Sequence, residues 1–180
     1  MKVGKFLGYL ISSRGIEVNP NQIQVVDCLK PLSNWKEVQV LTSMLVALNW
    51  FISKFVDYCW PFYQLLKKWK GFQWDEECEK AFQDLKEYLI QEPMLTAPKP
   101  EENLFMYLSV SKHAVSVVLL RDQGVQQPMY HISKTLVDAE TRYLPLEKLM
   151  LALMHATRKL PHYFQAHTVY VLTEYPLQSL

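Results

Sequence analysis

The stretch Leu104–Arg121 reads LFMYLSVSKHAVSVVLLR, and the fold depends on it. Every second residue from Leu104 to Val110 is apolar, which is the two-residue period of a β-strand with one buried face. The polar pair Lys112-His113 follows as a break, and the Val- and Leu-rich run Ala114–Leu120 predicts a second strand. The stretch therefore predicts a tight β-hairpin whose first strand carries Ser109 on its less apolar face.

The residues after this hairpin predict the rest of a sheet. A third strand is expected at Gln127–Ser133, and a long helix from Leu146 to about Leu160, closed by Pro161. A fourth strand is expected at His167–Thr173. This order, with a helical crossover before the last strand, predicts a mixed sheet of the α/β type with a packed helix.

The residues before the hairpin predict a small helical bundle that follows a short hairpin, so the whole chain is of the α+β or α/β class. One strand is expected at Lys5–Ser12, with a return strand at Ile16–Val18. The second helix carries apolar residues at spacings of three and four, and Val40 widens that stripe, which predicts a helix covered on two sides. The expected helices are Pro20 to about Leu29, Trp35 to about Phe55, Tyr58–Lys68 and, capped by Asp75, Glu76 to about Ile90.

A proline-rich stretch separates the bundle from the sheet. Gln91–Glu102 holds three prolines and shows no apolar period, so we interpret it as a linker and a domain boundary.

Composition limits the classes of function. The formal charge of +1 lacks the basic excess of a strong nucleic-acid binder, so any such contact must come from local patches. Three separated cysteines (Cys28, Cys59 and Cys78) argue against a disulfide scaffold and a zinc site, and fit a reducing compartment, cytoplasm or nucleus. No apolar run reaches the roughly 18 residues of a membrane span, and the N-terminus does not read as a signal peptide.

Four blocks of the sequence resemble a known family in their order. The blocks FLGYLISSRGIEVNPNQIQVV, ALNWFISKFVDYCWPFYQLLKK and FQWDEECEKAFQDLKEYL resemble the last palm hairpin and the thumb of a reverse transcriptase. The block SKTLVDAETRYLPLEKLMLALMHATRKLPHYFQAHTVYVLTEYPL is similar to the ribonuclease H-like domain that follows. The succession resembles the Pol polyprotein of gypsy-type LTR retrotransposons, closest to plant versions.

The resemblance implies four parts and a parent activity. The parts are the end of a palm at 1–19, a helical thumb-like domain at 20–92, a linker at 93–102 and a truncated, degenerate ribonuclease H-like domain at 103–180. The parent Pol protein makes DNA on an RNA template and hydrolyses RNA–DNA hybrids. The paired Asp of the polymerase signature does not occur in this chain, so we expect no polymerisation by the chain alone.

The resemblance also implies where a ribonuclease H centre would lie. Such a centre holds two divalent cations, Mg²⁺ or Mn²⁺, about 4 Å apart on clustered carboxylates. By the resemblance, the first Asp falls on Ser109, the helix Glu on Glu147 and the third acid on Glu174. A serine is a neutral, weak ligand, so we expect Glu147 and Glu174 to bind metal weakly, if at all, and hydrolysis to be absent.

The position of Glu147 can also be explained without the family resemblance. It lies at the border of the apolar stripe of its helix, where an edge carboxylate pairing with Arg158 would serve structure alone. Lys148, His155 and Lys159 are expected to share the polar face of that helix. Glu174 alone is an ordinary acid at a strand end.

Nucleic-acid contacts are expected in the thumb-like part. Lys67, Lys68 and Lys70 interleave with Trp69 on an expected loop, which suits phosphate contact and stacking, although a solvated corner explains the same residues. The second helix resembles the thumb helix that follows the primer-template minor groove, and its expected contacts are Asn49 and Lys54. Trp50 stands where related elements carry a basic residue.

Three functions remain open from the sequence. The first is a non-catalytic connection piece of a Pol polyprotein that binds an RNA–DNA hybrid or a primer-template duplex, with the rest of Pol as its partner and no membrane contact. The second is an active metal-dependent ribonuclease H. The third is a co-opted protein-interaction module.

Overall fold

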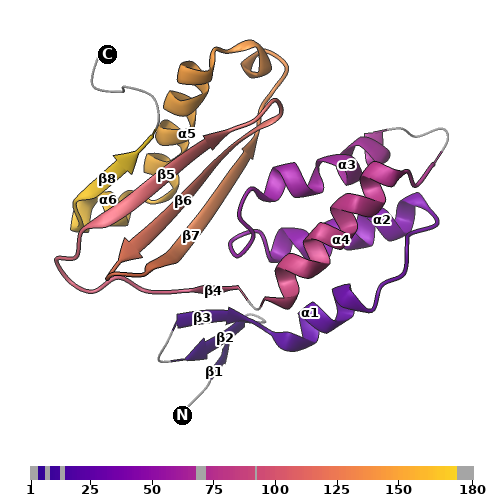
Figure 1. The fold of residues 1–180 in the computed structure, drawn as a ribbon, viewed down its shortest axis with the longest axis horizontal. Coiled ribbons are helices and arrows are strands. Elements are labelled where there is room, and N and C mark those ends of the chain that lie inside the picture. The colour runs from indigo at the N-terminus through magenta and orange to yellow at the C-terminus, as the bar shows by residue number, and fades with distance from the viewer. Residues whose placement is uncertain (1–3, 7–8, 13–14, 68–71, 92, 174–180) are drawn as a thin grey trace.

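A computed structural model describes residues 4–6, 9–12, 15–67, 72–91 and 93–173 of the chain. Figure 1 shows a small sheet near the N-terminus, a helical bundle, and a larger sheet with helices against it. No helix of these described residues is long and apolar enough to cross a membrane. The mixed helix-and-sheet class predicted from the sequence is confirmed.

The small sheet is antiparallel and has the order β1-β2-β3-β4. Phe6 pairs with Tyr9, so the chain reverses between them, and the single strand expected at Lys5–Ser12 is wrong. The fourth strand comes from inside the predicted linker and pairs with β3. The strands are β1 (Gly4–Phe6), β2 (Tyr9–Ser12), β3 (Gly15–Val18) and β4 (Met94–Leu95).

The close approach of β4 explains why position 15 is a glycine. Gly15 has a φ of +145°, and a Cβ built there would lie 2.1 Å from the carbonyl oxygen of Leu95. A side chain at this position would therefore push β4 away from β3.

The bundle has four helices, and local signals start three of them. Asn19, Asn34 and Asp75 each place a side-chain oxygen on a free N–H of the first turn. The fourth helix has the predicted bounds. The helices are α1 (Pro20–Asp27), α2 (Trp35–Ala47), α3 (Phe55–Lys67) and α4 (Glu76–Ile90).

Helix α2 ends at Ala47, so the expectation that it continues to Phe55 is wrong. Phe51 and Ile52 remain fully buried, which keeps the apolar spacing although the chain has left the helix. The hydroxyl of Tyr88 donates to the carbonyl of Phe51 over 2.8 Å and accepts from the N–H of Ser53 over 3.1 Å. These bonds satisfy the backbone of the turn, and α3 then begins three residues earlier than expected.

The larger sheet has the order β7-β6-β5-β8, and β5 and β8 are parallel, as the predicted crossover requires. Helix α5 packs against β5 and β6. The helix ends just before Pro161, as expected, and Pro161 begins a further short helix, because proline fits a first helical turn. The elements are β5 (Leu104–Val110), β6 (Ala114–Asp122), β7 (Gln126–Thr135), α5 (Pro145–Lys159), α6 (Pro161–Ala166) and β8 (Val169–Leu172).

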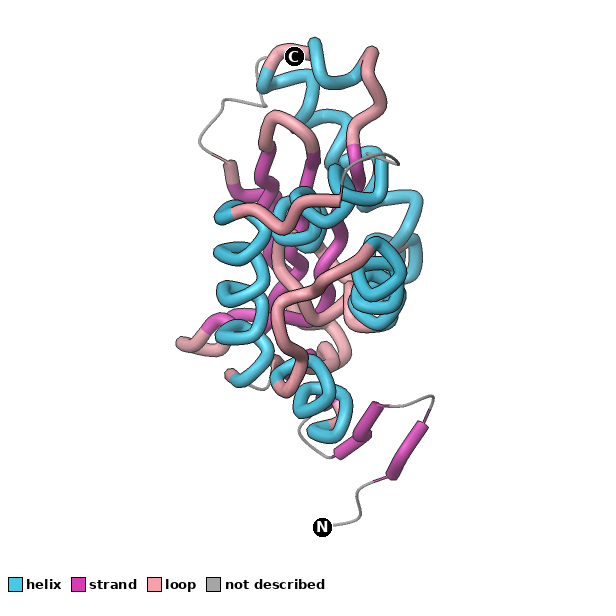
Figure 2. Tube along the Cα trace, turned by 90° about the vertical axis from the view of Figure 1, so that its right-hand side faces the viewer, coloured by secondary structure: helices cyan, strands magenta, loops and turns pink. Residues whose placement is uncertain are grey.

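The bundle and the larger sheet lie side by side. Helix α3 contacts β6 and β7, and β4 contacts β7. The side view in Figure 2 places the small sheet at one end of the molecule, near the N-terminus. Residues 93–102 lead through β4 toward β5, so the predicted linker contains a paired strand.

Candidate functional site

Ser109 lies in β5, between β6 and β8, as the hairpin prediction requires. A groove of about 630 Å³ opens at this point, where β5, β8 and α5 meet. It is lined by Tyr107, Leu108, Ser109, Val110, Leu149, Leu172 and Thr173.

The groove offers little to a divalent cation. Among the described lining residues the side-chain oxygens are hydroxyls, and no carboxylate lines it. Mg²⁺ and Mn²⁺ need charged oxygen ligands, so this donor set does not fit them. Within the described ranges, no three His, Cys, Asp or Glu residues gather as a metal site. Glu174, the third predicted ligand, lies outside the described residues.

Glu147 is placed away from the groove. Its carboxylate accepts a hydrogen bond from the N–H of Leu144 over 2.7 Å, which satisfies a free donor at the start of α5. Leu149 lines the groove instead and is only 3% exposed. Residues two positions apart in an α-helix lie about 200° apart around its axis, so Glu147 and Leu149 lie on nearly opposite sides of α5. The described α5 residue that lines the groove is therefore Leu149, and the role of Glu147 as a ligand stays a prediction.

Lys148 is not on the polar face where it was expected. It is 8% exposed, and its Nζ donates to the carbonyl oxygen of Ser111 over 3.3 Å. The long methylene stem packs in the core while the ammonium reaches a backbone acceptor. The polar face expected for α5 therefore holds for the exposed Lys159 but not for Lys148.

The predicted nucleic-acid contacts are only partly described. Asn49 and Lys54 lie in the turn between α2 and α3, not on a helix as expected. Lys67 is exposed at the end of α3, and its Nζ lies 5.4 Å from the centre of the Trp60 ring. Lys68, Trp69 and Lys70 lie outside the described residues.

The outer face of α2 is open, so the expectation of a helix covered on two sides is wrong. Val40 and Val46 are exposed there, beside Lys36, Gln39 and Ser43. These positions recur at spacings of three and four and form one stripe without a carboxylate.

Trp50 continues this stripe into the turn. It is 46% exposed and stacks on Tyr9 of β2, with ring centres 6.2 Å apart. Its ring centre also lies 5.9 Å from that of Tyr130 in β7. The position expected to be basic thus carries an aromatic that touches both sheets.

Sequence relatives of the chain are Pol proteins of mobile elements and retroviruses. It is 28% identical, over 99% of its length, to the Pol polyprotein from transposon 297 of Drosophila melanogaster, covering 17% of that protein. It is 27% identical, over 90% of its length, to the transposon Tf2-3 polyprotein of Schizosaccharomyces pombe, covering 12% of it. The Pol polyprotein of feline endogenous virus ECE1 is 24% identical over 97% of the chain, which covers 17% of that protein. The chain thus spans under a fifth of these relatives.

Solved structures of foamy viral protease-reverse transcriptase share the fold. The dRH form in complex with double-stranded DNA matches with a TM-score of 0.80 at 20% identity, over 99% of this chain and 32% of that one. The complex with an RNA/DNA hybrid matches with a TM-score of 0.77 at 17% identity, over 97% and 30%.

A family profile described as the RNase H-like domain found in reverse transcriptase matches residues 74–171. This range runs from the cap of α4 through the larger sheet to β8 and includes Ser109 and Leu149. Because the match covers more than half of the chain and agrees with the Pol relatives, the chain belongs to the family of RNase H-like domains found in reverse transcriptases.

Proposed function

We propose that this region is a non-catalytic connection module of a reverse transcriptase polyprotein. It holds an RNA–DNA hybrid or a primer-template duplex without cutting it, and it spaces the polymerase from a separate nuclease. The observation that carries the proposal is the groove at Ser109, where the β5 residue at the expected acid position is a serine and the described lining residue from α5 is a leucine.

The physical reason for proposing no catalysis is the charge of this groove. A two-metal nuclease needs several carboxylates to hold its cations and to position the attacking water. Neither the Ser109 hydroxyl nor the Leu149 side chain supplies negative charge, and the Glu147 carboxylate bonds to Leu144. Mg²⁺ or Mn²⁺, which the parent family uses, is therefore not expected to bind here.

The open stripe on α2 supports contact with nucleic acid. It presents Lys36, polar Gln39 and Ser43, and apolar side chains, with the exposed carboxylate of Glu37 at its edge. Lys67 is a further exposed cation on the bundle. The foamy viral proteins of the same fold were solved with double-stranded DNA and with an RNA/DNA hybrid, which supports the same class of partner.

A cleavage assay tests the absence of catalysis. An RNA–DNA hybrid with Mg²⁺ or Mn²⁺ is incubated with the unmodified chain, with Ser109→Asp, and with Ser109→Asp/Leu149→Glu. We expect no cleavage by the unmodified chain, and metal binding in the double variant, because it places two carboxylates on the described walls of the groove. Thr157→Asp, on the exposed side of α5, is the control for added charge. Metal-dependent cleavage by the unmodified chain that disappears in Glu147→Ala would contradict the proposal and favour an active nuclease.

A binding assay tests the partner. Affinity for a hybrid duplex should fall with salt, and changing Lys67, Lys68 and Lys70 to Ala should lower the salt slope by up to about 0.9 for each phosphate that these lysines neutralise. Lys99→Ala removes one positive charge from an exposed site outside the bundle and serves as the control for each single lysine change. Binding without salt dependence would favour a protein-interaction module.

A further inference from the structure

We propose that β6 is anchored at both of its ends, to the helical bundle at one end and to the connecting segment 93–102 at the other, so that the bundle and the larger sheet move as one body. The proline-rich segment 93–102, which the sequence predicts as part of a linker, then acts as a fixed brace and not as a hinge. This inference concerns the mechanics of the chain and does not rest on the proposed function.

The first latch lies at the start of β6. The hydroxyl of Ser111 donates to Oδ1 of Asp57 in α3 over 2.6 Å, across 54 positions of sequence. The ring of His113 stacks on Trp60 of α3, with centres 3.9 Å apart and planes 11° apart. Lys148 of α5 donates to the carbonyl of Ser111 from the other side. The turn between β5 and β6 is therefore held by both the bundle and α5.

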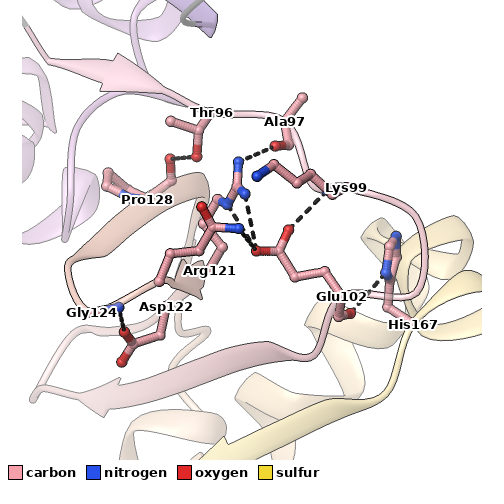
Figure 3. A network of polar contacts seen from close by, with 10 residues as sticks. Thr96, Ala97, Lys99, Glu102, Arg121, Asp122, Gly124, Pro128 and His167 are labelled. Carbon is pink, nitrogen blue, oxygen red and sulfur yellow. Dashed lines mark hydrogen bonds and ion pairs between the residues drawn. The ribbon is translucent and has the colours of Figure 1, made fainter.

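The second latch lies at the other end of β6 (Figure 3). Arg121 is 7% exposed, and its Nε donates to Oε1 of Glu102 over 3.0 Å while Nη1 donates to the carbonyl of Ala97 over 3.0 Å. The other oxygen of Glu102 accepts from the N–H of Lys99 over 2.8 Å. Nδ1 of His167, just before β8, lies 3.0 Å from the carbonyl oxygen of Glu102.

The charges of this latch are mutually satisfied. Burial would raise the pKa of Glu102, but the Lys99 N–H and the Arg121 guanidinium outweigh it and hold the pKa below its ordinary value. Removing either partner would leave the other charge buried and unpaired, which is far more destabilising than losing an exposed pair.

The brace continues from this latch into the small sheet. The N–H and the hydroxyl of Thr96 both donate to the carbonyl of Pro128 in β7, over 2.9 and 3.2 Å. Met94 pairs with Glu17, and Leu95 with Ile16, in β3. One extended segment thus bonds to both sheets within a few residues.

The two latches restrict motion of the bundle relative to the sheet because they lie far apart along β6. A single contact leaves the bundle free to rotate in any direction about it. Two separated contacts leave only rotation about the line that joins them, and the contacts of α3 and of β4 with β7 oppose that rotation. The nine residues of β6 place the latches roughly 25 Å apart. Relative motion, the ordinary expectation for two units joined by a linker, is therefore suppressed.

Distance measurements between two spin labels test this inference on the full chain. One label goes on Cys28, exposed at the end of α1, and the other on Val125→Cys, since Val125 is 69% exposed in the β6–β7 turn. Cys59 and Cys78 are buried, and burial raises the pKa of each thiol to about 12, so they stay unlabelled. We expect a narrow distribution in the otherwise unmodified chain.

Cutting both latches should widen the distribution. Ser111→Ala/His113→Ala opens the first latch and Arg121→Gln/Glu102→Gln the second, and all four changes together should broaden the distribution roughly twofold. Lys134→Gln, which breaks an ion pair with Glu140 and removes no bond of either latch, is the control and should leave the width unchanged. A broad distribution before any cut, or an unchanged width after all four, would overturn the proposal.

Amide exchange keeps the test decisive if the fourfold variant does not fold. In Arg121→Gln alone, the Thr96 amide should exchange about tenfold faster, because the brace that holds it on Pro128 has no anchor. Unchanged exchange at Thr96 in a folded Arg121→Gln chain would likewise overturn the proposal.

Discussion

His131 in β7 shows how burial sets the charge of one side chain. It is 9% exposed, and burial lowers the pKa of its imidazole to about 4, so the ring is neutral in the folded chain near neutral pH. It is one of the five histidines, none of which stands at metal-ligand spacing in the sequence. Its effect is on stability.

Acid should destabilise the fold through His131. The unfolded chain takes up this proton below pH 6.5 and the folded chain only near pH 4, so stability is complete above pH 6.5 and falls by roughly 3 kcal/mol on the way to pH 4. Urea unfolding between pH 7 and pH 4 measures it. His131→Gln should flatten this part of the profile, whereas His162→Gln, at an exposed site, should not. An identical pH profile in His131→Gln would show that another group is responsible.

The strand that carries Ser109 could be predicted from the sequence, whereas the α5 residue that lines the groove could not. Strict alternation in β5 fixes the face of Ser109, so its place in the sheet followed from the sequence. The helix partner depends on how α5 is rotated, and one residue is about 100°. Sequence spacing alone did not separate Glu147 from Leu149, and the position of β8 beside β5 was needed to define the groove.

Helices and strands could be predicted from the sequence where the signals that set them are local. Asp75 caps α4 and fixes its first residue, and the hairpin of β5 and β6 is set by alternation and a polar break. Two features depend on distant partners and were missed. The end of α2 depends on Tyr88, which is 37 residues from Phe51. The strand β4 has two residues and exists because β3 is beside it.

The turn between α2 and α3 should depend on the Tyr88 hydroxyl. Tyr88→Phe removes the bonds to Phe51 and Ser53 and leaves both backbone groups partly buried, which should cost about 1–3 kcal/mol of unfolding free energy. Urea unfolding measures the loss, and amide exchange at Ser53 should rise with it. Tyr143→Phe, at an exposed position, is the control. Equal stability of the two variants would mean that apolar packing alone holds the turn.

The whole molecule has two apolar cores that meet at β6. The core of the bundle includes Ala114 from the first residue of β6, while Val115 and Val117 of the same strand belong to the core of the larger sheet. A strand shared by two cores transmits the loss of one to the other.

The unmodified chain should therefore unfold in one calorimetric transition. Cutting both latches should split this transition in two, because the bundle and the sheet are then no longer coupled through β6. Lys134→Gln should lower the midpoint without splitting it. Two separate transitions in the unmodified chain would contradict the prediction.

The groove at Ser109 also bears on how the fold survives without ions. Carboxylates gathered in one place repel each other, and a nuclease centre depends on its cations to offset that repulsion. The described walls of this groove carry hydroxyls and hydrocarbon, so there is no such repulsion to neutralise. We expect the thermal midpoint to be the same in chelator as in millimolar Mg²⁺, and to rise with Mg²⁺ only after Ser109→Asp/Leu149→Glu.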